Sequence, residues 1–276
     1  VDNLDLNTIS CLGIQKVASL KVNQLPEFER VDTNSIVCLN LDPITLEVAS
    51  SDNRSYRYNW TKDGLDYPLN IAGEDAQVLV YEGGTYEANA TTTDGTACSK
   101  KIRMVLVSSE IATLTQDDLT VIDLEGDTGS VEINTLNLGV GDYEFALDDP
   151  FGPFQDDPYF ENILPGIYKV YIQDKNGCGI AEIETSILGH MKFFSPNGDG
   201  INDFWKILGV SENFQPNSRV YVYDRNGKLL VDLDPLGVGW DGTYNGFQLP
   251  QDDYWFRVFF DNGKERIGHF SLLRPE

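Results

Sequence analysis

Hydrophobic and polar residues alternate in short runs along the whole chain. The segments 167–172 (IYKVYI), 219–224 (RVYVYD) and 254–260 (YWFRVFF) show this pattern most clearly. A period of two is typical of β-strands that bury one face. No window places apolar residues at i, i+3, i+4 and i+7 over three helical turns. The pattern therefore predicts an all-β protein.

A strand, a turn and a second strand recur along the chain and divide it into units. Cys11, Cys98 and Cys178 each stand in such a turn, 87 and 80 residues apart, which is the length of a small β-sandwich. A Tyr begins the preceding strand at Tyr86 and Tyr168, and Tyr254 repeats this feature. We predict tandem immunoglobulin-like β-sandwiches, ending in a seven-stranded one. The expected domains are a remnant of an upstream immunoglobulin-like domain at 1–28, an immunoglobulin-like or PKD-like sandwich at 29–109, an acidic sandwich at 110–189, and a last domain at 190–276.

The cysteines are expected to be structural. Cys38 and Cys98 flank Trp60 within the second unit, and sandwiches of this type often pack a Trp against a disulfide between their two sheets. We therefore predict a Cys38–Cys98 disulfide. The chain has no C-x-x-C motif and only His190 and His269 as imidazoles, so no zinc site is predicted.

The charge of the chain excludes several classes of partner. A formal net charge of −24 argues against nucleic acid and against anionic membrane surfaces, both of which attract Lys and Arg. No apolar run approaches 18 residues, so direct membrane insertion is not expected. Residues 110–189 hold 17 acidic and 2 basic side chains, whereas residues 190–276 hold 12 and 9. We interpret the acidic stretch as a solvated surface.

Candidate catalytic residues are scarce. The two histidines are accompanied by no Gly-x-Ser-x-Gly motif and no phosphate-binding loop, so we do not predict an enzyme.

The loop at 195–203 (SPNGDGIND) holds a candidate cation site. Asn197, Asp199 and Asp203 fall at positions 3, 5 and 9 of a calcium loop, but position 12 is Lys206 in place of Glu. We expect a turn network in which Asn and Asp side chains bond the loop's own backbone, with Ca²⁺ as the alternative. No other cofactor is expected.

Two further patterns predict local features. Asn226-Gly227 and Asn262-Gly263 each lie between alternating runs, which predicts two hairpins with type I′ turns.

Trp60, Trp240 and Trp255 are candidates for stacking on sugars, and a carbohydrate-binding module of a secreted surface protein is the alternative function. A stacking platform requires exposed ring faces, whereas a core Trp is buried.

The third unit contains the segments GDYEFALDDPFGPFQ at 141–155 and LPGIYKVYIQDKNGC at 164–178. With these segments it resembles the adhesin repeats of giant surface proteins in gliding bacteria. The first Cys that is usual in that repeat is missing here.

Four motifs occur in order in the last unit: FFSPNGDGINDFWKI, RVYVYDRNGKLLVD, WDGTYNGFQLPQDDYWFRV and GHFSLLRP. With these motifs the unit resembles the type B C-terminal sorting domain of the type IX secretion system, also called the gliding motility-associated C-terminal domain. The residues that match the family are Phe194, Pro196, Asn197, Gly198, Asp199, Gly200, Asn202, Asp203, Arg225, Gly227, Trp240, Asp241, Gly242, Leu249, Pro250, Tyr254, Gly268, Leu273 and Arg274.

This resemblance implies a protein exported across the outer membrane of a Gram-negative bacterium to the cell surface. It implies that the last domain engages the type IX translocon and outer-membrane β-barrel shuttle or anchor proteins. We predict the C-terminal part of a cell-surface adhesin in which the preceding domains form a stalk. We also expect the loop backbone at 195–203 and an edge of the last strand to be read by the barrel partner through β-augmentation.

Overall fold

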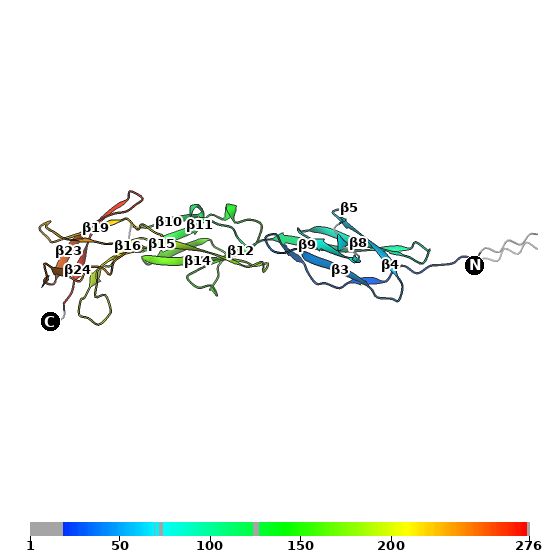
Figure 1. Ribbon diagram of the computed structural model, residues 1–276, viewed down its shortest axis with the longest axis horizontal. Helices are drawn as coiled ribbons and strands as arrows, with labels where there is room; N and C mark the ends of the chain where they lie inside the picture. Colours follow the sequence, from blue (N-terminus) through cyan, green and yellow to red (C-terminus); the bar gives the residue numbers. More distant parts are fainter. Residues whose placement is uncertain (1–18, 69, 72–73, 124–126, 275–276) are drawn as a thin grey trace, which may run out of the picture. The chain divides into compact units, whose positions relative to one another are not determined.

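The computed structural model describes residues 19–68, 70–71, 74–123 and 127–274 (Figure 1). These residues form 24 strands and two 3₁₀ turns, Gln116–Asp118 and Thr135–Asn137. The predicted all-β class, with tandem immunoglobulin-like sandwiches, is confirmed. Residues 1–18 with Cys11, part of the predicted upstream remnant, lie outside the described residues, and residues 19–27 contain no strand.

The described chain divides into two compact units. Unit 1 comprises the residues up to 35 and residues 43–107, and unit 2 comprises residues 36–42 and 108–276. The short segment 36–42 thus belongs to unit 2, although it precedes most of unit 1 in sequence. The domain limits expected from the sequence stay a prediction.

Unit 1 contains two sheets. The first has the order β1 (Phe28–Arg30), β3 (Ile44–Ser50), β7 (Glu74–Val80), β6 (Asn70–Ile71). The second has the order β2 (Ile36–Cys38), β9 (Ser99–Ser109), β8 (Gly84–Thr92), β4 (Tyr56–Lys62), β5 (Leu65–Asp66), in which β2 belongs to unit 2. Trp60 is buried and its indole N–H donates to the Asp75 carbonyl at 2.9 Å. Leu46, Val78 and Tyr86 are buried as well, so the alternating strands of both sheets each contribute a buried face to the core of unit 1.

The first half of unit 2 is a sandwich of two three-stranded sheets. One has the order β10 (Leu119–Ile122), β11 (Gly129–Ile133), β13 (Tyr159–Ile163). The other has the order β12 (Tyr143–Leu147), β14 (Gly166–Asp174), β15 (Ile180–Ile187). We call residues 110–187 the acidic repeat. The core between its sheets includes Val131, Phe145 and Ile172. β2 (Ile36–Cys38) ends beside this sandwich, where the Leu39 N–H donates to the Ser109 carbonyl at 2.8 Å.

The second half of unit 2, residues 188–274, holds the strands β16 to β24. Its main sheet has the order β17 (Phe193–Phe194), β24 (Glu265–Leu272), β23 (Asp252–Phe259), β19 (Arg219–Tyr223), β20 (Leu229–Leu233). The two-stranded pairs are β16 (Gly189–His190) with β18 (Ile207–Leu208) and β21 (Thr243–Tyr244) with β22 (Phe247–Gln248). β23 follows the expected alternation, because Tyr254, Phe256 and Val258 are buried while the residues between them face solvent. We call residues 188–274 the C-terminal domain.

The recurring Tyr has the same role in three places. The hydroxyl of Tyr86 donates to the Glu82 carbonyl at 2.8 Å. The hydroxyls of Tyr168 and Tyr254 likewise donate to the carbonyls four residues upstream, Leu164 at 2.8 Å and Pro250 at 2.9 Å. Such a contact resembles the tyrosine corner of immunoglobulin-like sandwiches. This hydrogen bond explains why a Tyr recurs at the start of these strands.

The two predicted Asn-Gly hairpins form, but with a different turn. Gly227 and Gly263 have positive φ, whereas Asn226 and Asn262 do not, so these turns are not type I′. In each case the Gly N–H donates three residues back, Gly227 to Asp224 and Gly263 to Phe260, both at 3.0 Å. This is a type I turn that ends in a Gly bulge, the usual three-residue hairpin loop.

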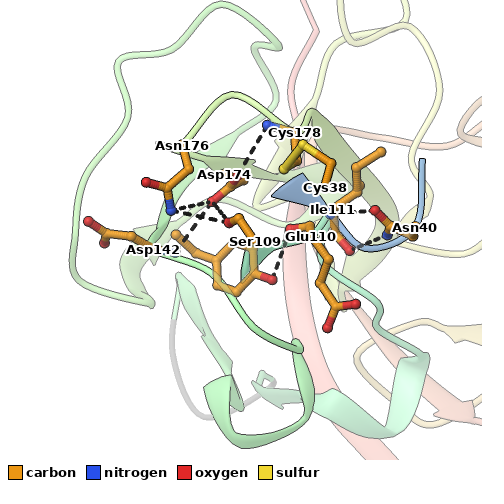
Figure 2. Close-up of a disulfide and its surroundings, with 10 residues drawn as sticks. Cys38, Asn40, Ser109, Glu110, Ile111, Asp142, Asp174, Asn176 and Cys178 are labelled. Atoms are coloured by element: carbon orange, nitrogen blue, oxygen red, sulfur yellow. Dashed lines mark hydrogen bonds between the residues drawn. A yellow bond between two sulfur atoms is a disulfide. The ribbon is translucent and has the colours of Figure 1, made fainter. Parts of the chain in front are cut away.

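The predicted Cys38–Cys98 disulfide is wrong. Cys38 is bonded to Cys178, with the two Cα atoms 5.5 Å apart (Figure 2). Cys98 is a free thiol. Cys98 lies just before the first residue of β9, whereas Leu39 pairs with Ser109 at its last residue. Ten strand residues extend about 33 Å. A disulfide joins Cα atoms within about 7 Å, so the position of β2 excludes the predicted pair.

Candidate functional site

The loop that opens the C-terminal domain is organised around one carboxylate. Asp203 Oδ1 accepts the backbone N–H groups of Asn197 at 3.0 Å and Gly198 at 2.7 Å, and Oδ2 accepts that of Gly200 at 2.8 Å. These hydrogen bonds, led by those from Gly198 and Gly200, lower the pKa of Asp203. The Ser195 N–H closes the loop by donating to the Asn202 carbonyl at 2.7 Å.

A second set of contacts links the side chains within the loop. Asn197 Nδ2 donates to Asp199 Oδ2 at 2.8 Å, and the Asp199 N–H donates to Asn197 Oδ1 at 2.9 Å. The Ile201 N–H donates to Asp199 Oδ1 at 2.8 Å. The loop therefore has the expected Asn and Asp turn network. The oxygens of Asn197, Asp199 and Asp203 accept N–H donors of the loop itself. Ca²⁺ at these three residues stays a prediction.

Trp240 fixes the third motif in the core. Its ring lies 5.6 Å from Phe194 and 5.2 Å from Tyr254, measured between ring centroids, and Phe194 comes from the first motif. The indole N–H donates to the Thr243 carbonyl at 2.9 Å. Backbone hydrogen bonds in both directions join Trp240 to Trp205, at 2.8 and 2.9 Å. The first and third motifs therefore share one aromatic core.

Arg274 links the fourth motif to the third. Its Nε donates to the Leu249 carbonyl at 2.8 Å and one terminal nitrogen donates to the Gly242 carbonyl at 3.2 Å. Gly242 has a φ of +75°, and a Cβ there would lie 3.2 Å from Phe194 and 3.3 Å from Arg274. Only Gly combines this backbone conformation with such close neighbours. Asp241 holds the adjacent turn by accepting the Thr243 N–H at 3.0 Å.

The motifs meet at a shallow depression of about 270 Å³ on the surface. Its lining comes from motif one and from motifs three and four: Pro196, Gly198, Asp203, Phe204, Asp241, Thr243, Gln248 and Arg274. Phe204, Thr243 and Gln248 were not among the site residues expected from the sequence. Their position between matched residues of the same motifs was the signal that could have identified them. We call this depression with the loop 195–203 the motif surface.

The remaining matched residues have structural positions. Arg225 pairs with the Asp252 carboxylate, and Gly227 completes the hairpin between β19 and β20. Leu249 packs against the core, and Pro250 provides the carbonyl for Tyr254. A Cβ at Gly268 would lie 2.6 Å from the Phe256 ring.

The last strand is not an edge strand where it carries the fourth motif. β17 runs parallel to β24 and pairs Phe194 with Leu272, while β23 pairs along the other side. The Leu273 N–H donates to the Phe194 carbonyl at 2.9 Å. The backbone N–H groups of the loop at Asn197, Gly198 and Gly200 are also satisfied internally. The expected β-augmentation at this end of β24 therefore lacks free main-chain groups.

The C-terminal domain is joined directly to the acidic repeat. Ser186 donates its hydroxyl to the Gly209 carbonyl, and Leu188 begins the C-terminal core. Across the same junction Lys264 Nζ lies 3.2 Å from Asp123 Oδ1, whose side chain is 5% exposed. Lys192 also pairs with Asp127. Basic residues of the less acidic domain thus face carboxylates of the repeat.

The tryptophans differ in exposure. Trp60 is 1% and Trp240 is 3% exposed, so neither presents a ring face to a sugar. Trp255 is 38% exposed on the outer face of the main sheet. It borders a groove of about 430 Å³ with Tyr223, Arg257 and Ile267.

No group of three or more His, Cys, Asp or Glu side chains gathers as a metal site within the described residues. None of the described helices is long and apolar enough to cross a membrane.

Comparison with protein families gives one match. Residues 188–272 match the model of the CHU_C Type IX secretion signal domain. This signal indicates export of the protein to the cell surface or extracellular space by the type IX secretion machinery, as predicted. No curated protein sequence matches the chain.

The chain is also similar to solved structures at low identity. Sidekick-1 immunoglobulin domains 1–5 are 12% identical with a TM-score of 0.39, and the match covers 91% of this chain and 60% of that one. The insect immune protein hemolin is 13% identical with a TM-score of 0.32, covering 91% and 77%. The fibronectin(III)-like modules of Clostridium thermocellum CbhA are 9% identical with a TM-score of 0.30, covering 58% and 93%.

Proposed function

We propose that this protein is part of a cell-surface adhesin whose C-terminal domain is read by the type IX translocon and an outer-membrane barrel partner. The preceding sandwiches form the stalk. The observation that carries the proposal is the motif surface, where residues from Pro196 to Arg274 lie around one depression, and all of them except Arg274 fall within the matched residues 188–272. Residues that are far apart in sequence but share one surface are what a partner common to many cargoes needs.

The contact is made by exposed side chains of the motif surface. Six N–H groups of the loop already have acceptors, those of Ser195, Asn197, Gly198, Asp199, Gly200 and Ile201. The loop therefore offers a partner its shape and its exposed apolar side chains. Ile201 is 67% and Phe204 is 42% exposed, although both are apolar. Exposed apolar residues held on a fixed loop are typical of an interaction site.

The test is surface display of the full chain in a host with a type IX system. Ile201→Asp with Phe204→Asp is expected to reduce display at least tenfold while the purified protein keeps its melting temperature. Leu136→Asp is the matched control, because Leu136 is 90% exposed on the acidic repeat. Normal display of the double variant would contradict this role for the motif surface.

The stalk role is supported by the immunoglobulin-like units and the acidic surface that precede the signal. We further propose that residues 19–187 act by binding and extension and have no catalytic role. Cells that display the full chain should adhere to their target surface or to partner cells. Cells that display residues 188–276 alone should not. Equal adhesion by both would refute the stalk role without affecting the export signal.

A second candidate function is sugar binding at Trp255, favoured by the groove beside its exposed ring. Sugar titration should quench Trp fluorescence in the wild type and not in Trp255→Phe. Unchanged fluorescence with a panel of surface polysaccharides would exclude this candidate.

A further inference from the structure

The Cys38–Cys178 disulfide closes a very large loop of the chain. Cys38 ends β2, and Cys178 lies in the turn between β14 and β15, 140 residues later. Both cysteines belong to unit 2. Residues 43–107 of unit 1 and the strands β10 to β14 of the acidic repeat all lie inside the loop. The loop holds about half of the 276 residues.

The backbone on both sides of the disulfide is firmly held (Figure 2). Asp174 is 1% exposed, and its carboxylate accepts the Cys178 N–H at 3.1 Å and the Ser109 hydroxyl at 2.9 Å. Burial alone would raise the pKa of Asp174, but these hydrogen bonds outweigh it and lower the pKa. The carboxylate is therefore charged at neutral pH and fixes the turn that carries Cys178.

The segment that carries Cys38 is held in the same way. The Asn40 side chain accepts the Ile111 N–H at 3.1 Å and donates to the Ile111 carbonyl at 3.0 Å. The Leu39 N–H donates to the Ser109 carbonyl. The disulfide thus joins two ordered segments of unit 2 and not two mobile loops.

From this covalent path we propose that the disulfide is a tension bypass, which carries a pulling force past the loop. Force applied between the two ends of the chain reaches Cys38, crosses the sulfur atoms and continues from Cys178. The peptide between residues 39 and 177 is not part of the loaded covalent path, because the disulfide joins its two ends directly. Once the hydrogen bonds between the loaded β1 and β3 have broken, the covalent path alone carries the force past the loop. Even if the sandwich inside the loop unfolds, its residues add nothing to the contour length of the stretched chain.

Only two parts of the described chain remain under load. The first is residues 19–38, where β1 pairs with β3 from Phe28 to Arg30. The second is residues 178–274, which include β15 and the C-terminal domain. In that domain β17 and β24 lie near the two ends and run parallel, so tension shears their hydrogen bonds together. The bypass therefore protects the loop and leaves the C-terminal domain as a load-bearing element.

The use of this device at a cell surface rests on the proposed stalk function, whereas the bypass itself does not. It is measured on the purified full chain, held by tags at its two ends, in single-molecule force spectroscopy. Oxidised wild-type protein should release a contour length about 490 Å shorter than the same protein in reductant, from 140 residues at ~3.5 Å each. If the protein is not exported but the oxidised and reduced forms still differ in contour length, only the proposed function is rejected and the bypass stands.

Variants separate this pairing from the alternatives. Cys178→Ser should release the long contour length with or without reductant, and Cys98→Ser should behave as wild type. Mass mapping without reductant should find one peptide pair joined through Cys38 and Cys178. Full release by the oxidised wild type, or a long release by oxidised Cys98→Ser, would overturn the proposal.

Discussion

Ile187 and Leu188 are adjacent in sequence, yet their side chains are buried in two different hydrophobic cores. Ile187 packs with Val131 and Ile172 of the acidic repeat, whereas Leu188 packs in the core of the C-terminal domain. The two residues are 0% and 4% exposed. The peptide bond between them is therefore the domain boundary, and no linker separates the two cores.

The first prediction uses this separation of cores. Leu188→Ala should destabilise the C-terminal domain by about 2–4 kcal/mol, because it removes a large side chain from a packed core. Hydrogen exchange should show lost protection in β23 and retained protection in β14. Ile187→Ala is the matched control with the reverse pattern, and equal losses in both strands for either variant would contradict two separate cores.

The second prediction concerns the smallest signal that supports export. The sequence places the start of the last domain at residue 190, but a fusion beginning there lacks Leu188. A reporter fused to residues 188–276 should reach the surface in larger amounts than one fused to residues 190–276, because the shorter signal has an unfilled core. Equal display of the two reporters would show that Leu188 is dispensable for export.

The third prediction concerns the link between the third and fourth motifs. Arg274→Lys keeps the charge but cannot reach the Leu249 and Gly242 carbonyls with the same planar group. We expect a loss of about 1–2 kcal/mol in urea unfolding and reduced surface display. Arg219→Lys, at an exposed position of β19, should change neither. An unaltered unfolding midpoint for Arg274→Lys would show that these two hydrogen bonds do not stabilise the domain.

The local features of this fold follow from local sequence. The alternation in β23 predicts which side chains are buried, and the Tyr before each turn marks a contact only four residues away. Turn positions were also predictable, since Asn-Gly pairs favour turns. The turn type was not, because an Asn-Gly pair also fits a three-residue loop in which Gly alone has positive φ, as in both of these turns.

The long-range features could not be predicted from the same patterns. Cysteine spacing does not define which cysteines pair, and Cys38 found Cys178 because residues 36–42 leave unit 1 for unit 2. The motif surface was predicted as a set of residues through family resemblance, but its depression depends on Arg274 reaching a carbonyl 32 residues earlier. Contacts of this kind depend on how the strands are ordered in the sheet.

The fourth prediction is a pH dependence set by His190. Burial lowers the pKa of His190 to about 4, and Lys192 and Arg266 act in the same direction. The ring lies 4.6 Å from Phe256 in the C-terminal core. In the unfolded chain the pKa is about 6.5, so between pH ~6.5 and ~4 the unfolded state binds a proton that the folded state does not. Stability should therefore fall as the pH decreases through this window.

The full shift would correspond to about 3 kcal/mol, and solvent around the partly exposed ring should reduce it to about 1–2 kcal/mol. Chemical unfolding at pH 7 and at pH 4.5 measures the difference. His190→Gln should reduce the dependence, while His269→Gln, at an exposed position on β24, should preserve it. Identical pH profiles for wild type and His190→Gln would refute the assignment.

The last prediction concerns the ion pair that crosses the domain boundary. Asp123 and Lys264 are unequal partners, because the Asp123 side chain is 5% exposed and the Lys264 side chain is 53% exposed. Removing the lysine leaves a buried carboxylate with the Leu188 N–H at 3.3 Å, whereas removing the aspartate leaves an ammonium group that water can solvate. A buried charge without its partner is costly, so Lys264→Ala should destabilise unit 2 by about 1–3 kcal/mol and Asp123→Ala by less. In the Asp123→Asn background, Lys264→Ala should cost little, and a double-mutant cycle in urea unfolding gives the coupling. If both single variants lose the same small amount, the carboxylate is solvated and the junction is not held by this pair.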